Sequence, residues 1–496
     1  MKKILGYTLL LFFLASCTKG FEDLNKPPTT SASIDPGALL AQVQLTFKYH
    51  QGVEYQNCTF GSWIQHWNSS NNIPESRYLF NRRFTGYYDE IRNISQIRNH
   101  ILAGQEDTPE GRTKLAIARI VEIDVWRTQT NVFGDIPYSE TALGEKNLIP
   151  QPKFDTQESI YLDLIAKLNE AIRNLNTADV SYGKSDLYYG GDVQKWIKYA
   201  NALKLQIGMT LRYVKPDLAV QVITEALQGP IISSNNDNAM IETSTTYQSS
   251  YHPVLRHFSS GSPDNKYLAE AFVNRLLDTK DPRLTFIVEP TLSSHGGEPI
   301  YRGKAVAPTD EEMVGVIHDN FSTASTNTFF SLTYNGTNPI PHYVYTYSEI
   351  CFYKAEIALE NWAGLTSSQA EEFYQEGIRA AMALKPFNIT DIPQEYIDDE
   401  FSFTGLDKEQ QLEKIMTQKW ILLFGRSIDA FNEWRRTGYP KLTPGNNPGA
   451  TNGQIPRRAG YPNNELLLNA DNYHDAVNRM SHGDSYLSRV WWDVKD

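Results

Sequence analysis

The chain has 496 residues, a formal net charge of −12 at pH 7, 41% hydrophobic residues and 21% charged residues. This composition is typical of globular proteins with one large domain or two or three smaller ones. The acidic balance argues against nucleic-acid binding and against electrostatic docking on an anionic membrane, because both need clustered Lys and Arg. The 28 Tyr, 22 Phe and 9 Trp fit either a large packed core or a surface that stacks on flat ligands.

The N-terminus has the layout of a bacterial lipoprotein leader. Lys2 and Lys3 precede the apolar run 4–14, and two small residues then precede Cys17. The run is too short for a membrane-spanning helix, which needs about 20 apolar residues. We therefore expect a signal peptide over 1–16 and a lipid on Cys17, with an ordinary secretory signal as the alternative.

After the leader, a polar, proline-containing tether is expected over 17–34 and a single large domain over 35–496. Asp35 as N-cap and Pro36 as first helical residue begin the first helix. Apolar residues spaced three and four apart predict the later helices. These are expected at 112–132, after the capping-box-like pair Asp155 and Glu158, after Asp192, and at 219–227, 266–277, 348–361, 367–384 and 410–424.

Helices of this length, separated by turn residues, favour a mainly α fold. We expect degenerate tetratricopeptide-like helix pairs forming an α-α superhelix, with few short strands, although the sequence contains no strict repeat. Long irregular segments at 233–265, 289–347 and 437–465 are the first places to seek a binding surface, because long loops in compact domains are usually functional. Short strands are predicted at 283–288 and 343–347.

The cysteines exclude a disulfide framework. Once Cys17 carries lipid, only Cys58 and Cys351 remain, too few for a multi-cysteine metal site. One bridge between them is open, but Cys351 lies in an apolar helical stretch. Free cysteine commonly behaves as a small buried hydrophobic residue, so we favour two unpaired core thiols.

Catalytic and metal-binding motifs are absent from the sequence. It contains no G-x-S-x-G elbow, H-E-x-x-H, P-loop or G-x-G-x-x-G. His252 and His257 are five residues apart and share no helical or strand face, so we predict no metal. The adjacent carboxylates at 398–400 are expected to form a solvated loop, because an acid/base pair must flank a cleft. We expect no cofactor.

A set of phrases runs in order along nearly the whole chain: NVFGDIPYSE (131–140), WIKYANALKL (196–205), DPRL (281–284), YSEI (347–350) followed by AE (355–356), QKW (418–420), FNEWRRTGYP (431–440), IPRR (455–458) and VWWD (490–493). Each phrase also has an architectural interpretation: Gly134 and Gly438 fit left-handed helix ends, and Arg435 and Arg436 fit the negative end of a helix dipole. Together, and in this order, the phrases resemble the SusD/RagB family of Bacteroidetes outer-membrane lipoproteins.

The resemblance implies a helical protein with four tetratricopeptide-like pairs supporting a loop-rich face. It further implies a lipid-anchored, surface-exposed position on the outer membrane. There the protein would be the lid of a SusC-like, TonB-dependent transporter that imports captured oligosaccharides or peptides. No catalysis is implied.

Two loop segments have the mixture of aromatic and hydrogen-bonding residues that sugar binding needs. In the first, the resemblance favours Trp67, Asn68, Arg77 and Tyr78. Trp63 belongs to the same candidate set, but Trp63 and Trp67 are four residues apart and would share one helix face, so a core role for at least one of them is equally open.

The second segment is polar, aromatic and poor in aliphatic residues, which argues against burial. It contributes Tyr247, Tyr251 and His252 as ligand-binding candidates. The sequence does not identify the ligand. Two other functions are kept as alternatives: a cell-surface hydrolase, and a helical-repeat scaffold or adhesin that binds no small ligand.

Overall fold

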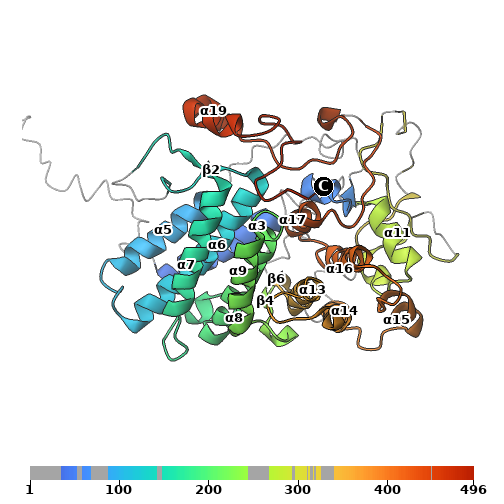
Figure 1. Cartoon of the computed structure of the whole chain (residues 1–496), viewed down its shortest axis with the longest axis horizontal. Coiled ribbons are helices and arrows are strands. Elements are labelled where there is room, and N and C mark those ends of the chain that lie inside the picture. Colours follow the sequence, from blue (N-terminus) through green and yellow to red (C-terminus); the bar gives the residue numbers. More distant parts are fainter. Residues whose placement is uncertain are drawn as a thin grey trace, which may run out of the picture.

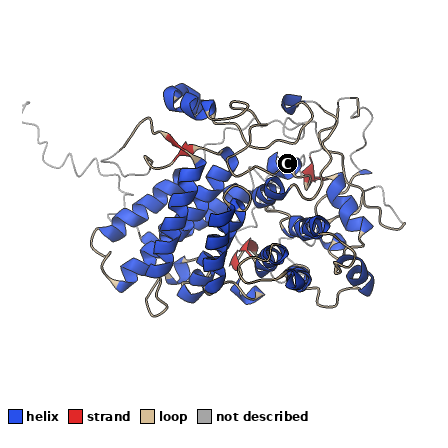
Figure 2. Cartoon of the chain, in the orientation of Figure 1, coloured by secondary structure: helices blue, strands red, loops and turns tan. Residues whose placement is uncertain are grey.

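The computed structural model describes residues 35–52, 59–68, 88–141, 148–243, 267–292, 297–309, 311–312, 317, 320–325, 340–447 and 449–495. The fold is mainly helical, with a few very short strands (Figures 1 and 2). The longer helices are α3 (Pro36–Gly52), α5 (Tyr88–Leu102), α6 (Pro109–Phe133), α7 (Gln157–Asn174), α8 (Val193–Leu211), α9 (Pro216–Gln228), α11 (Glu270–Asp278), α13 (Tyr347–Leu359), α14 (Ala370–Met382), α16 (Lys408–Leu422), α17 (Ser427–Thr437) and α19 (Ala470–Asn478).

Short helices and strands complete the description. The short α-helices are α4 (Gly61–Trp63), α12 (Leu284–Ile287), α15 (Gln394–Glu400) and α18 (Asn463–Leu468). The strands are β1 (Trp67–Asn68), β2 (Ile136–Pro137), β3 (Phe154–Asp155), β4 (Ala239–Ile241), β5 (Tyr267–Leu268) and β6 (His342–Tyr345), with 3-10 turns at Gly183–Ser185, Asn235–Asp237, Ser367–Gln369 and Gly449–Thr451. In the described part of the chain, no helix is both long and apolar enough to cross a membrane.

The predicted helix pairs are confirmed. Within the described residues, helix α3 packs on α5, α6 on α7, α8 on α9 and α13 on α14, which gives the four expected pairs. The first three pairs form the bundle on the left of Figure 1, and α13 and α14 lie beside α16 on the right. Because each pair presents an apolar stripe to its neighbours, stacking the pairs makes one continuous core.

Most predicted helix starts agree with the structure. The Asp35 side chain accepts a hydrogen bond from the Gly37 N–H at 3.1 Å, and Asp192 caps α8 by accepting from the Lys195 N–H. The prediction that Asp155 and Glu158 form a capping-box-like pair at the start of α7 was wrong. Thr156 is the N-cap there, whereas the Asp155 carboxylate accepts bonds from the backbone and hydroxyl of Ser139 across the β2–β3 ladder.

The strand predictions had mixed outcomes. The strand expected at 343–347 is present as β6, which pairs antiparallel with β4. The strand expected at 283–288 was wrong: Leu284–Ile287 forms one helical turn. The helix expected from 266 begins only at Glu270, since Tyr267 and Leu268 form β5 and pair with β1.

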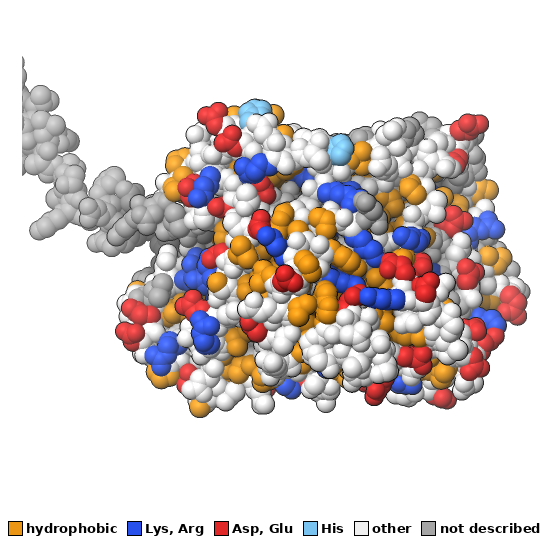
Figure 3. Space-filling model, viewed as in Figure 1, with side chains coloured by type: hydrophobic (Ala, Val, Ile, Leu, Met, Phe, Trp, Pro, Cys, Tyr) orange, Lys and Arg blue, Asp and Glu red, His pale blue; other side chains and the backbone are white. Residues whose placement is uncertain are grey.

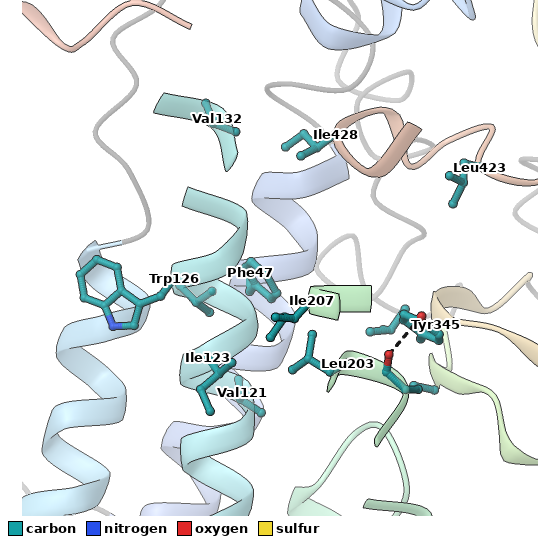
Figure 4. Packing of buried hydrophobic residues seen from close by; sticks show 14 of the residues in the cluster. Phe47, Val121, Ile123, Trp126, Val132, Leu203, Ile207, Tyr345, Leu423 and Ile428 are labelled. Atoms are coloured by element: carbon teal, nitrogen blue, oxygen red, sulfur yellow. Dashed lines mark hydrogen bonds between the residues drawn. The ribbon is translucent and has the colours of Figure 1, made fainter. Parts of the chain in front are cut away.

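The hydrophobic core joins the helix pairs to the C-terminal helices. Phe47 of α3, Leu203 and Ile207 of α8, Tyr345 of β6 and Ile428 of α17 lie in one cluster (Figure 4). The Tyr345 hydroxyl donates to the Ala202 carbonyl at 3.3 Å, so the polar end of the buried ring has a partner. A smaller second cluster lies between α13, α14 and α16.

The quoted phrases are structural. The guanidinium groups of Arg283, Arg435 and Arg436 are at most 2% exposed and bind carboxylates, carbonyls or amides in the interior. Gly438 ends α17 with the predicted left-handed conformation, at φ 76° and ψ 11°. Gly134 also has a positive φ, 87°, but its ψ of −122° lies outside the left-handed helical region.

Candidate ligand-binding site

Three residues predicted to bind ligand lie in the interior instead. Trp63 and Trp67 are 0% exposed and Asn68 is 1% exposed. The Trp67 ring stacks on Phe424 at a centroid distance of 4.6 Å, and Trp63 makes an edge contact with Phe60 at 5.0 Å. Neither indole has a free face, so we assign both rings to the core.

Asn68 supports the neighbouring loop rather than facing solvent. Its amide nitrogen donates to the carbonyl oxygens of Lys304 at 3.0 Å and Ala305 at 2.5 Å. Tryptophans and amides close together in a sequence do not distinguish a buried structural segment from a sugar-binding site, because the same side chains occur in both.

The remaining predicted site residues lie outside the described residues. These are Arg77 and Tyr78 of the first segment, Tyr247, Tyr251 and His252 of the second, and the lipidation candidate Cys17.

Both segments nevertheless meet the described fold at one place. Asn68 is the last described residue before 69–87, and Tyr267 is the first after 244–266. These two residues are directly paired in the antiparallel β1–β5 ladder. The chain therefore enters one candidate loop and leaves the other at the same two-stranded ladder.

An open pocket of about 390 Å³ lies beside this ladder, on the loop-rich side of α11. Tyr301 and Phe321 contribute half-buried rings, and Asn274 and Arg302 contribute exposed hydrogen-bond donors. Other lining residues are Glu270, Gly303, Lys304, Ala305, Pro308 and Glu312.

Backbone pairing fixes the walls of the pocket. The Lys304 N–H donates to the Leu268 carbonyl of β5 at 2.8 Å, and the Glu270 N–H donates to the Lys304 carbonyl at 2.9 Å. On the other side, the Ser322 N–H donates to the Arg302 carbonyl at 2.7 Å. Residues 301–305 thus run between α11 and residue 322, so that both half-buried rings are held on ordered backbone.

The pKa values of the ionisable groups in the pocket are shifted in different directions. Burial lowers the pKa of the Lys304 ammonium to about 8, and the ammonium lies 5.7 Å from the centre of the Tyr267 ring. Burial also raises the pKa of Tyr301. Hydrogen bonds from the Thr309 N–H and the Asn446 amide lower the pKa of Glu312. A lowered carboxyl pKa is the opposite of what a general acid in glycoside hydrolysis requires.

Sequence reasoning missed the individual residues of this pocket, Tyr301, Phe321, Arg302 and Asn274. Tyr301, Arg302 and Phe321 lie in the long irregular segment 289–347, one of the predicted places to seek a binding surface, whereas Asn274 lies in α11, within the helix predicted over 266–277. Within that segment, the spacing of aromatic residues gave no reason to select Tyr301 or Phe321.

The comparisons with known proteins identify a family. Residues 28–462 match the SusD-like family that is described as starch-binding and associating with the outer membrane. No curated protein matches the chain.

Several solved structures share the fold over their whole length. A chitin-binding protein is 28% identical, with a TM-score of 0.77, covering 93% of this chain and 100% of that chain. A SusD-like protein of Bacteroidetes AC2a is 25% identical, with a TM-score of 0.78 and the same coverage. A SusD homologue from Bacteroides uniformis is 23% identical, with a TM-score of 0.78, again covering 93% and 100%.

Proposed function

Since this chain belongs to the SusD-like family, whose members are described as starch-binding and associated with the outer membrane, we propose that it captures a nutrient oligosaccharide at the cell surface. It then acts as the lid of a SusC-like, TonB-dependent transporter. The alternative ligand class is a peptide.

The pocket beside the β1–β5 ladder carries this proposal. The rings of Tyr301 and Phe321 supply apolar faces for stacking on sugar rings, and Asn274 and Arg302 supply donors for hydroxyl groups. The exposed carboxylates of Glu270 and Glu312 supply acceptors. This division into ring faces and polar edges matches the two kinds of surface on a pyranose.

The segments on either side of the ladder extend the proposed site. We propose that Arg77, Tyr78, Tyr247, Tyr251 and His252 also contact the ligand. Their support is the Asn68–Tyr267 pairing, which anchors one end of each segment at the pocket. The similarity to a chitin-binding protein makes an oligosaccharide of N-acetylglucosamine the first ligand to test.

The proposed membrane attachment rests on the leader. A lipid on Cys17, after removal of 1–16, would place the folded domain on a tether that ends where α3 begins at Pro36. Fully extended, the 17–34 tether spans roughly 60 Å, enough for the domain to swing while it stays at the membrane.

Affinity electrophoresis against soluble starch, glycol chitin and peptides tests the binding step. We expect retardation in one polysaccharide gel, and about fivefold to tenfold weaker affinity in Tyr301→Ala, as for loss of one aromatic stacking contact. The matched control is Tyr473→Ala, which removes another half-buried tyrosine on α19. Equal loss in both variants, or no retardation in any gel, would reject the pocket.

Two further measurements separate the alternatives. Purification from outer membranes in detergent should recover a large barrel protein in equal amount with this chain, whereas recovery of the chain alone contradicts the lid role. A cell-surface hydrolase predicts new reducing ends or peptide fragments, and loss of that activity in Glu270→Gln or Glu312→Gln. A scaffold predicts no retardation at all.

A further inference from the structure

A second, larger pocket lies on the opposite part of the molecule from the loop-rich site. It measures about 540 Å³ and is bounded by α5, α6, α7 and the residues around the β2–β3 ladder. Helix α6 packs against both α5 and α7, so the pocket opens across the α6 surface between its two neighbours. In Figure 1 these helices form the left of the view, whereas α11 lies at the right.

The pocket lining is highly charged and unequally balanced. It contains the cations Arg98, Arg119, Lys153 and Lys167, but only the carboxylates Glu122, Asp155 and Asp163. The lining therefore carries one excess positive charge in a chain whose overall net charge is −12. Figure 3 shows basic and acidic side chains interspersed over this part of the surface.

The excess charge falls at the Arg98 guanidinium. Two pairs are closed locally, Lys167 with Asp163 at 2.6 Å and Lys153 with Asp155 at 3.7 Å. Glu122, by contrast, is shared by two arginines, Arg98 and Arg119.

Arg119 lies closer to the Glu122 carboxylate than Arg98 does. Its Nη1 lies 2.8 Å from one carboxylate oxygen, whereas Nη2 of Arg98 lies 3.4 Å from the other. Among the described residues, the buried Nε of Arg98 has no hydrogen-bond partner. Burial also lowers the pKa of Arg98, so this guanidinium lacks part of the solvation that a cation needs. A ligand carboxylate in contact with this guanidinium would restore part of that solvation through charge-assisted hydrogen bonding.

The rest of the lining suits a hydroxylated molecule. Asn99 is exposed on α5, and Ser139, Thr141 and Ser159 place hydroxyl groups around the opening. The Thr141 and Ser159 hydroxyls donate to the carbonyls of Tyr138 and Thr156, which leaves their oxygens as acceptors for ligand hydroxyls.

We propose that the pocket between α5, α6 and α7 binds a small hydroxylated carboxylic acid of the acidic-monosaccharide class, with Arg98 and Arg119 holding its carboxylate. Trp126 supplies an apolar wall. Its ring is 3% exposed, lies on the α5 side of α6 in Figure 4, and contacts Tyr138 edge-on at 5.0 Å. The site does not depend on the proposed function, because it shares no residue with the pocket beside the β1–β5 ladder.

Isothermal titration with sodium galacturonate tests the site, with galactose as the uncharged probe of the same shape. We expect galacturonate to bind and galactose to bind at least about tenfold more weakly, because galactose lacks the carboxylate. Arg98→Gln should weaken galacturonate binding by about tenfold or more. The matched control is Arg92→Gln on the same helix, since Arg92 is 66% exposed and pairs with Asp89 outside the pocket.

Asn99→Asp is a second variant that keeps the side-chain size at an exposed position. It should weaken galacturonate binding by charge repulsion and leave the melting temperature unchanged, so a folding defect in Arg98→Gln does not decide the outcome. Equal binding of galactose, tighter binding of inorganic phosphate than of galacturonate, or equal losses in Arg92→Gln and Arg98→Gln would overturn the proposal. Binding at this site is expected to survive Tyr301→Ala, which distinguishes its failure from failure of the oligosaccharide site.

Discussion

Arg436 and Glu356 form a bidentate ion pair in the interior, with Nη1–Oε1 at 2.5 Å and Nη2–Oε2 at 2.7 Å. Arg212 binds the same carboxylate, and Glu433 binds Arg436 from within α17. The pair joins α13 to α17, and Arg212 connects both to the end of α8. Two of the quoted sequence phrases therefore meet at one carboxylate in the core, which supports their structural role.

Removing the charge of Glu356 should destabilise the fold strongly. Glu356→Gln leaves Arg436 and Arg212 with less compensation in a buried site, which we expect to lower the free energy of unfolding by about 3–5 kcal/mol. Urea denaturation followed by circular dichroism measures this. Glu395→Gln is the control, because its partner Lys280 is exposed and the pair should contribute little. A Glu356→Gln variant as stable as Glu395→Gln would show that the network is not holding the helices together.

His66 should make the fold sensitive to mild acid. Burial lowers its pKa to about 3, although Nε2 lies 2.9 Å from the Trp420 carbonyl oxygen. Between the folded value and the ordinary value of about 6.5, only the unfolded chain binds the proton, so stability rises with pH in this window. From pH 7 to pH 5 the free energy of unfolding should fall by about 2 kcal/mol from this residue alone.

Glu356 contributes at lower pH, which separates the two effects. Although burial opposes it, the charges of Arg436 and Arg212 lower the pKa of Glu356 to about 2. Its stabilisation is therefore present above the ordinary carboxyl range and is lost between about pH 4.5 and pH 2.

Urea denaturation at pH 5 and pH 7 tests the contribution of His66. The free energy of unfolding should still depend on pH in His482→Gln, where the histidine is exposed, and should lose most of this dependence in His66→Gln. An unchanged slope in His66→Gln would contradict the assignment.

The sequence predicted the helical fold because its signals are local. Apolar spacing located the paired helices apart from α5, and Asp35 and Asp192 marked two helix starts correctly. The sequence did not identify Thr156 as the N-cap of α7, because Asp155, one residue earlier, is an equally good capping residue by type. In the structure the Asp155 carboxylate accepts hydrogen bonds from Ser139, and Thr156 caps the helix instead.

The ligand pocket was harder to predict because it is assembled from distant segments. Tyr301 and Phe321 lie beside Asn274 because backbone hydrogen bonds join residues 302–304 to Leu268, Glu270 and Ser322. The carboxylates at 398–400 show the same difficulty: the expected loop is the end of α15, where Glu400 is buried against Arg275 at 2.7 Å. No spacing rule relates residues 275 and 400.

Cys351 should resist thiol reagents in the folded protein. It is a free, buried thiol in α13, as expected for that position. Burial raises its pKa to about 12, and the thiolate is the reactive form. In a Cys17→Ser, Cys58→Ala background, iodoacetamide at pH 8 should label native protein more than about a hundredfold more slowly than urea-unfolded protein. Comparable rates in the two states would place the thiol at the surface.

Trp67 and Tyr301 should separate stability from ligand affinity. Trp67→Ala removes a fully buried indole that stacks on Phe424, so the free energy of unfolding should fall by about 3–5 kcal/mol. Trp67→Phe retains an aromatic ring of smaller volume and should recover part of this loss. Tyr301→Ala removes a half-buried ring at the pocket and should change the unfolding midpoint little while weakening oligosaccharide binding.

Urea denaturation and affinity electrophoresis on the same three variants measure both quantities. Folded Trp67→Phe should bind the oligosaccharide nearly as well as the unmodified chain, because the buried indole packs on Phe424 and is not part of the pocket lining. If Trp67→Phe loses affinity without losing stability, the indole reaches the ligand after all, and the original prediction from the sequence is correct. If Tyr301→Ala loses stability and affinity together, its ring supports the fold, and the ligand contacts must come from elsewhere on the loop-rich face.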